Sequence, residues 1–367
     1  TLFPYTTLFR SVPSSANISY YASVIDKKHR MRMLIEVAEQ IERMGYDEAG
    51  EIEEILDQAE KRVFEVTNYS GTHTYTHLKD TLEGALEQID RLHNNKGELR
   101  GVPTGFRDLD SKLSGFQNSD LIILAARPSM GKTAFALDIA RNTAVLHNLP
   151  VAIFSLEMSA DQLVQRMLAA QANVDSWTIR TGHGMTPENF SALRDASDKF
   201  SKAPIFIDDM PGNNIVKMRS VCRRLKAEHG LSMIVVDYLQ LMAPVSSKYS
   251  DSMVNQVTEI SRSLKHLARE METPVIALSQ LSREVEKRGG EPRLSDLRDS
   301  GSIEQDADVV MFIHREDKYN KESDKPNIAR IMIEKHRNGP TGAIELYYND
   351  KKTSFQTLDK SSDFGGF

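Results

Sequence analysis

From residue 101 onward, short apolar runs alternate with longer stretches in which apolar residues recur every three or four positions. Continuous apolar runs of this length are typical of strands buried on both faces, and the longer spacing is typical of helices that bury one side. The predicted strands are 121–125, 151–156, 205–207, 233–236, 275–278, 309–313, 328–333 and 343–348. The predicted helices are 132–147, 160–172, 187–202, 215–228 and 254–272. This alternation predicts an α/β fold with a mostly parallel central sheet flanked by helices, and an antiparallel edge formed by the last strands.

The pattern before residue 101 is purely helical. Residues 17–66 carry two successive apolar faces at helical spacing, separated by Gly45-Tyr46-Asp47, which predicts a helical hairpin without a large core. A polar segment, 67–76, then precedes an amphipathic stripe formed by Leu78, Leu82, Ala85, Leu86, Ile89 and Leu92. A lone amphipathic helix needs a surface on which to bury its stripe, in its own domain or on a neighbouring subunit.

We therefore expect a hairpin domain at 12–66, a linker with a helix at 67–100 and a large α/β domain at 101–367. Residues 1–11 fit none of these parts, lack the features of a signal peptide and are interpreted as an artefactual leader.

Composition and charge exclude several classes of protein. No run of 18 apolar residues exists, so the sequence predicts no membrane span. Cys222 is the only cysteine, which excludes an intramolecular disulfide and favours a cytoplasmic location. The net charge of −6 gives no overall attraction to nucleic acid, so any such contact must be local.

A phosphate-binding loop is the most informative chemical feature. The segment Ala126-Arg127-Pro128-Ser129-Met130-Gly131-Lys132-Thr133 lies between a predicted strand and a predicted helix. In such a loop, backbone N–H groups surround a phosphate chain, the lysine reaches the β- and γ-phosphates and the threonine hydroxyl binds Mg²⁺. We expect the nucleotide to be bound by Arg127, Ser129, Met130, Gly131, Lys132 and Thr133. The first glycine of the usual pattern is replaced by Ala126.

Two carboxylates follow predicted strands. Asp237 ends the run Met233-Ile234-Val235-Val236, and in phosphate-loop proteins such an aspartate holds Mg²⁺. Glu157 follows the run 151–156 and could take a proton from an attacking water, or could merely begin the next helix. Position alone does not decide between these two roles for Glu157.

Three further polar segments allow a functional and a structural interpretation. Gln280 follows a predicted strand and could contact the γ-phosphate or be an ordinary strand end. Lys335 and Arg337 flank a histidine before a turn, where an arginine could stabilise phosphoryl charge or belong to a solvated hairpin. The segment 294–305, with Arg298 and Gly301, could contact phosphates or be an ordinary loop.

Taken together, these motifs resemble the DnaB-type replicative DNA helicases, a family of RecA-like hexameric motors, over roughly residues 12–358. The most specific segments are 126–133, 154–158, 236–240, 296–308 and 335–340. Alanine at the position of Ala126 is usual in this family. The hairpin 12–66 resembles only the last part of the family's N-terminal domain, so the resemblance implies an N-terminally truncated form.

The resemblance assigns roles that the residues alone left open. It implies that Glu157 is the catalytic glutamate, Asp237 and Thr133 the metal residues, and Gln280 the γ-phosphate sensor. Arg337 and its companion Lys335 would act on the site of the next subunit. Arg298, Asp299 and Gly301 would hold single-stranded DNA through its phosphates, independently of sequence.

The implied function is that of a replicative helicase. We expect an ATP- and Mg²⁺-dependent homo-hexameric ring that moves 5′ to 3′ along single-stranded DNA, opens forked DNA and works with primase and a helicase loader. The alternatives are a RecA- or KaiC-like ATPase in recombination or signalling, and a nucleotide-binding scaffold without turnover.

Overall fold

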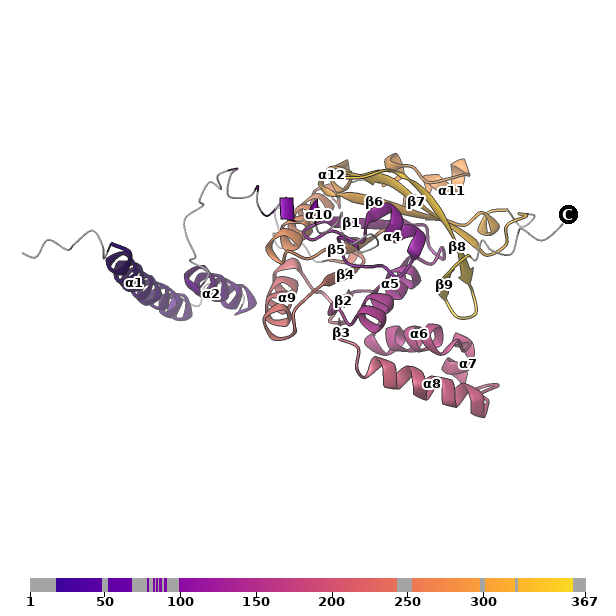
Figure 1. Ribbon diagram of the computed structural model, residues 1–367, viewed down its shortest axis with the longest axis horizontal. Coiled ribbons are helices and arrows are strands. Elements are labelled where there is room, and N and C mark those ends of the chain that lie inside the picture. The colour runs from indigo at the N-terminus through magenta and orange to yellow at the C-terminus, as the bar shows by residue number, and fades with distance from the viewer. Residues whose placement is uncertain are drawn as a thin grey trace, which may run out of the picture. The chain divides into compact units, whose positions relative to one another are not determined.

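The computed structural model describes residues 18–47, 52–67, 99–242, 253–297, 301–320 and 323–358, with individual positions between 78 and 90 (Figure 1). The chain divides into two compact units, Thr1–Arg91 and Leu92–Phe367. Across the described residues, no helix is long and apolar enough to cross a membrane.

The first unit contains two helices that contact each other, α1 (Ile18–Asp47) and α2 (Ile52–Thr67). The predicted break at Gly45-Tyr46-Asp47 was wrong, because these residues form the end of α1. Among the described residues of this unit, Val66 is the buried apolar side chain. The exposed apolar side chains include Ile25, Leu34, Ile35, Ile52, Leu56, Leu78, Leu82, Leu86 and Ile89.

The second unit is built around nine strands. They are β1 (Leu121–Ala126), β2 (Val151–Ser155), β3 (Ile205–Asp208), β4 (Met233–Asp237), β5 (Val275–Gln280), β6 (Val309–His314), β7 (Ile328–His336), β8 (Gly342–Asn349) and β9 (Ser354–Thr357). They form one sheet in the order β3-β2-β4-β5-β1-β6-β7-β8-β9. The first six strands pair in parallel, and β6 through β9 pair antiparallel. The predicted sheet and its antiparallel edge are confirmed, and β9 is a strand that the apolar pattern missed.

The helices of this unit follow the prediction closely where they are long. They are α4 (Arg107–Leu113), α5 (Lys132–His147), α6 (Ala160–Ala172), α7 (Ser176–Thr181), α8 (Pro187–Phe200), α9 (Ile215–His229), α10 (Met253–Glu270), α11 (Glu284–Arg288) and α12 (Gly301–Asp306). The four short helices, α4, α7, α11 and α12, were not predicted, because five to seven residues are too few to show a helical period.

Two apolar layers enclose the sheet. Along β1, Ile122 and Leu124 belong to the cluster that includes Phe135 of α5, whereas Leu121 and Ile123 belong to the cluster on the opposite face. That second cluster contains residues of α9 and α10, which lie on the other side of the sheet from α5 in Figure 1. Burial on both faces explains why these strands read as continuous apolar runs.

The parallel register brings four strand ends to one edge of the sheet. Ala126 of β1 lies beside Gln280 of β5, and Ser155 of β2 lies beside Asp237 of β4. Ligands of open parallel sheets bind beyond the carboxyl ends of the strands. The fold therefore gathers the loops after β1, β2, β4 and β5 around one position.

Candidate nucleotide site

The loop after β1 has the backbone that a phosphate cradle needs. Ser129 and Gly131 lie in the left-handed region, with φ of 67° and 95°, and α5 begins at Lys132. A Cβ on Gly131 would lie 2.8 Å from Phe355 Cζ and 3.0 Å from Tyr348 Cε2. Glycine is therefore required at 131 both by its φ and by the closeness of β8 and β9.

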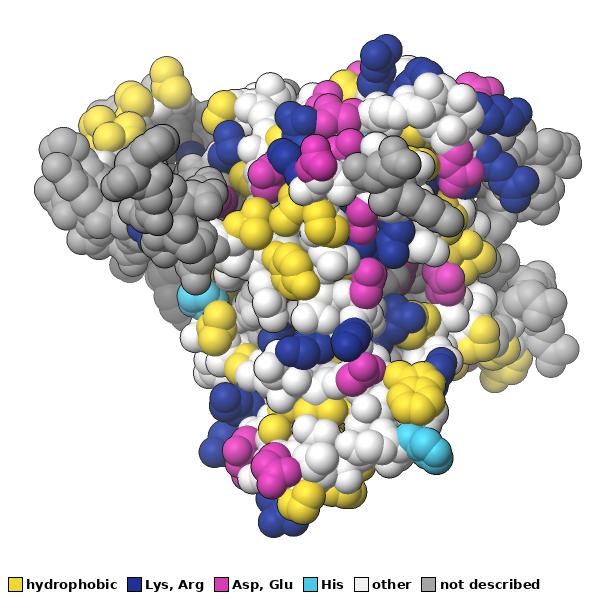
Figure 2. Space-filling view, turned by 90° about the vertical axis from the view of Figure 1, so that its right-hand side faces the viewer, with side chains coloured by type: hydrophobic (Ala, Val, Ile, Leu, Met, Phe, Trp, Pro, Cys, Tyr) yellow, Lys and Arg dark blue, Asp and Glu magenta, His cyan; other side chains and the backbone are white. Residues whose placement is uncertain are grey.

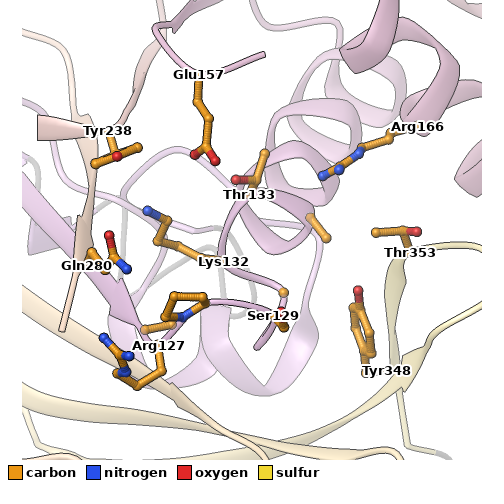
Figure 3. Close-up of a pocket in the computed structure, with 14 residues that line it drawn as sticks. Arg127, Ser129, Lys132, Thr133, Glu157, Arg166, Tyr238, Gln280, Tyr348 and Thr353 are labelled. Carbon is orange, nitrogen blue, oxygen red and sulfur yellow. The ribbon is translucent and has the colours of Figure 1, made fainter. Parts of the chain in front are cut away.

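A cavity of about 400 Å³ opens over this loop (Figure 3). Beyond the loop and the start of α5, its lining comes from five separate segments of the chain: Glu157, Arg166, Tyr238, Gln280, Tyr348 and Thr353. In Figure 3, Lys132, Glu157, Tyr238 and Gln280 lie towards one end of the cavity, whereas Arg166, Tyr348 and Thr353 lie towards the other. The volume and the mixed lining are those of a small-molecule site.

Lys132 and Thr133, which line the cavity, both contact the buried Asp237. The Thr133 hydroxyl donates to Asp237 Oδ2 at 2.7 Å, and Lys132 Nζ lies 3.8 Å from Asp237 Oδ1. The same ammonium lies 4.4 Å from the centre of the Tyr238 ring, a cation–π contact. The three residues come from α5 and β4, so the parallel sheet sets their spacing.

Burial shifts the ionisation of this group. It lowers the pKa of Lys132 although the negative charges of Asp237 and Glu157 oppose the shift. It also raises the pKa of Asp237 against the effect of Lys132 and the Thr133 hydrogen bond. For both groups, desolvation outweighs the attraction between the opposite charges. A further charged group that entered the cavity would therefore interact strongly with Lys132 and Asp237.

Glu157 and Gln280 face the same cavity from different strands. Glu157 follows β2, and its side chain is exposed rather than packed in the core. Gln280 is the exposed last residue of β5. In Figure 3 the Glu157 carboxylate points towards Lys132 and Thr133, where an attacking water would need a base.

Two side chains of the predicted nucleotide set are occupied by contacts within the protein: Met130, which is not part of the cavity lining, and Arg127, which lines the cavity but is paired elsewhere. The Met130 side chain is buried in the apolar layer that contains Phe135. The guanidinium of Arg127 is buried against Leu281 and Glu286 rather than free for phosphates. Any contact of Met130 with a nucleotide would therefore involve its backbone.

Arg337 and Lys335 lie at the opposite edge of the sheet. The Arg337 backbone N–H donates to Asp308 O at 2.8 Å, and its Nη1 lies 3.3 Å from Asp308 Oδ1. Lys335 Nζ donates to Glu304 O at 2.5 Å. Asp308 immediately precedes β6, which runs parallel to β1, so this end lies at the amino-terminal edge, away from the phosphate loop.

The predicted DNA residues Arg298 and Asp299 lie outside the described residues, and Gly301 is the first residue of α12. On the face that Figure 2 shows, basic and acidic side chains are interspersed rather than gathered by sign.

Sequence reasoning missed four residues that line the cavity: Arg166, Tyr238, Tyr348 and Thr353. Tyr238 could have been found from its place directly after Asp237. Arg166 lies inside α6 and Thr353 in the turn before β9, and neither position carries a local signal. Tyr348 belongs to a predicted strand, and only the packing of β8 against the phosphate loop brings it to the site.

Comparison with known proteins identifies the family of this chain. The family model of the DnaB-like helicase C-terminal domain matches residues 101–357. The replicative DNA helicase DnaB of Geobacillus stearothermophilus is 50% identical over 354 residues, which cover 96% of this chain and 78% of that protein. The replicative DNA helicase DnaC of Bacillus subtilis (strain 168) is 48% identical over 362 residues, 98% of this chain and 79% of that protein.

Solved structures show the same architecture. A DnaB-like replicative helicase, studied with its interactions with primase, is 33% identical, with a TM-score of 0.79, and the match covers 95% of this chain and 81% of that one. A separately solved ATPase domain is 37% identical, with a TM-score of 0.72 and coverage of 76% and 99%. The predicted RecA-like α/β fold is therefore confirmed. The chain belongs to the DnaB-like replicative DNA helicases, which are ATP-dependent enzymes.

Proposed function

We propose that this chain is the motor subunit of a homo-hexameric ring that moves 5′ to 3′ along single-stranded DNA and hydrolyses ATP between adjacent subunits. The observation that carries the proposal is the position of Arg337. It lies at the amino-terminal edge of the sheet, whereas the phosphate loop follows the carboxyl end of β1. The six residues of β1 span about 20 Å, too far for an arginine side chain to reach. A second copy must therefore supply the arginine if it acts at all.

Within one subunit, the cavity orients a triphosphate. The left-handed loop and the start of α5 hold the phosphates, with Lys132 at the end that faces Glu157 and Gln280. Glu157 accepts a proton from the attacking water, and Gln280 contacts the γ-phosphate. The adenosine end then extends towards Arg166, Tyr348 and Thr353 at the other end of the cavity.

The metal residues fit Mg²⁺. Oδ1 of Asp237 is buried and accepts no hydrogen bond, and the Thr133 hydroxyl oxygen lies beside the same carboxylate. Hard oxygen ligands next to phosphates are what Mg²⁺ prefers. We infer that Thr133 and Asp237 would hold the ion, which neutralises charge on the phosphate oxygens when bound.

Other parts of the proposal rest on sequence and exposure. We infer that 12–66 is the hairpin of an N-terminal domain, that 67–100 is a linker whose helix docks on an adjacent subunit, and that 101–367 is the motor. The exposed Leu78, Leu82, Leu86 and Ile89 support the docking, since an apolar stripe needs cover. A related helicase has been solved with its interactions with primase, which supports primase as a partner.

Mixed rings test the trans arrangement. Arg337→Ala and Lys132→Ala subunits are each expected to form rings with ATPase lowered by about a thousand-fold. If the arginine acts in trans, mixing them creates some interfaces with both groups intact, and ATPase reappears. If it acts in cis, no mixed interface is complete and ATPase stays low.

Arg330→Ala is the matched control for this experiment. Arg330 lies on β7, the strand that Arg337 directly follows, and is similarly exposed, but it pairs with Glu291. Arg337→Ala rings with undiminished ATPase would refute the role of Arg337, provided that Arg330→Ala rings behave like the parent.

The DNA loop is tested by salt dependence. Arg298→Ala is expected to weaken binding of a single strand and to reduce the slope of log affinity against log salt in proportion to the lost phosphate contacts. Unwinding of a forked duplex with ATP and Mg²⁺ measures the consequence. Unchanged affinity and slope would remove Arg298 from the DNA contact.

A further inference from the structure

Arg127, the first side chain of the phosphate loop, makes its polar contacts outside the nucleotide cavity. Its Nε and Nη2 each lie 2.8 Å from Oε1 of Glu286, and its Nη1 donates to Leu281 O at 2.7 Å. The Arg127 side chain is 7% exposed and that of Glu286 46%. In Figure 3, Arg127 lies beneath Gln280, apart from Lys132, Thr133 and Glu157. These contacts tie the loop to the segment that follows β5.

That segment begins with Leu281, the residue that follows Gln280. Gln280 lies opposite Ala126 in the parallel register, and the next residue, Leu281, donates its N–H to Ala126 O at 3.2 Å. Arg127 then returns a hydrogen bond to Leu281 O. The Arg127 side chain thus adds to the backbone pairing that joins the phosphate loop to Gln280.

Glu286 is held in place independently of Arg127. It lies on α11, whose Val285 is fully buried. The same helix is fixed by Arg288, which donates to both carboxylate oxygens of Asp296 at 2.9 and 2.7 Å. Because α11 has its own anchors, Glu286 is a fixed acceptor against which the Arg127 guanidinium is positioned.

Burial makes this contact consequential. A buried guanidinium that loses its carboxylate keeps only the Leu281 carbonyl, which is an unfavourable state for a desolvated charge. It would then shift towards other acceptors and move the start of the phosphate loop with it. The pair Lys325–Glu345, at 2.9 Å, is exposed on both sides, so its loss should have little effect.

We propose that Glu286 is a positioning residue for ATP hydrolysis: through Arg127 it fixes the spacing between the phosphate loop and Gln280. This inference rests on the proposed nucleotide site and on the proposed contact of Gln280 with the γ-phosphate. A diphosphate contacts only the phosphate loop, whereas a triphosphate contacts both the loop and Gln280. Loss of Glu286 should therefore weaken triphosphate binding more than diphosphate binding.

The test measures both affinities in full-length rings. Glu286→Gln is expected to lower the affinity for ATPγS about ten-fold and the affinity for ADP by less than about two-fold. Turnover should show a raised KM for ATP and a reduced kcat. Glu286→Asp, which keeps the charge, should regain part of the loss. The double variant Arg127→Gln, Glu286→Gln should lose no more than Arg127→Gln alone, because the two residues act as one unit.

Two control variants and a melting curve separate positioning from stability. Glu284→Gln makes the same change at another exposed residue of α11, and Glu345→Gln breaks an exposed ion pair; both are expected to leave the ATPγS-to-ADP affinity ratio unchanged. An unchanged ratio in Glu286→Gln, or equal loss of both affinities with a lower Tm, would overturn the inference. A parent protein that binds no nucleotide, or a Lys132→Ala variant with undiminished binding, would instead refute the proposed nucleotide site.

Discussion

At the scale of single residues, the nucleotide site depends on a few residues that tolerate little change. Thr133 and Lys132 contact the same buried carboxylate, Asp237, and the cavity above them is lined by groups from five other segments of the chain. Gly131 is equally constrained, since its backbone is left-handed and two aromatic rings lie against its Cα. A substitution at this position tests the loop without changing any charge.

Gly131→Ala is expected to destabilise the protein by about 1–3 kcal/mol, because it combines a left-handed φ with a clash against Phe355 and Tyr348. Nucleotide affinity should fall as well, since the loop must move. Thermal melting and equilibrium binding of ADP measure the two effects. Gly182→Ala, at a left-handed position with nothing within 4 Å of the added Cβ, is the matched control for strain without clash.

At the scale of elements, β9 and α5 are joined through one buried carboxylate. Asp138 of α5 accepts from the Phe355 N–H at 2.7 Å and from the Ser354 hydroxyl at 3.2 Å, and Arg141 pairs with it at 2.9 Å. These contacts hold the last strand against the helix that begins in the phosphate loop. They also explain why Tyr348 and Phe355 reach Gly131.

Asp138 gives stability a defined pH dependence. Burial raises its pKa from 3.8 to about 6, although Arg141 and the Phe355 hydrogen bond oppose the shift. The folded state therefore binds a proton more tightly than the unfolded chain, so this contribution is complete below about pH 4 and is lost as pH rises to about 6. The loss amounts to at most about 3 kcal/mol.

Asp138→Asn removes this titration. The free energy of unfolding of the variant relative to the parent should increase between about pH 4 and pH 6, as denaturant melts at several pH values would show. The comparison with the parent matters because the pKa of Asp120 is also raised to about 6, chiefly by burial. A constant difference across this range would show that Asp138 does not titrate there.

At the scale of the whole molecule, the two units of the chain differ in how much apolar surface their described residues bury. Two apolar layers enclose the sheet of Leu92–Phe367, whereas Val66 is the buried apolar side chain among the described residues of Thr1–Arg91. Membership of the DnaB-like helicases decides against a recombination or signalling ATPase and against a scaffold without turnover.

A fragment of residues 92–367 is therefore expected to fold with a cooperative transition and to bind ADP as the parent does. The hairpin unit alone, residues 12–91, should show weak or non-cooperative melting, because its apolar side chains have little to pack against. Calorimetry of the two fragments and the parent provides the measurement. A fragment 92–367 that fails to fold would mean that its core needs the first unit.

Local sequence by itself determined most of the fold, because continuous apolar runs are stable as strands buried on both faces and long amphipathic stretches as helices that cover them. It also predicted the phosphate loop, Asp237 and the order of the motifs. The sequence pattern did not predict several short elements. One example is β9 (Ser354–Thr357), which is a strand only because it pairs with β8 and is hydrogen-bonded to Asp138.

Only the tertiary structure decided which side chains share the cavity and which do not. Arg166, Tyr348 and Thr353 meet the phosphate loop through long-range packing, which leaves no trace in local pattern. The same packing turns Arg127 towards Glu286 and places Arg337 at the far edge of the sheet. The reason is physical: period and composition report which face of an element is buried, whereas a site depends on which elements become neighbours.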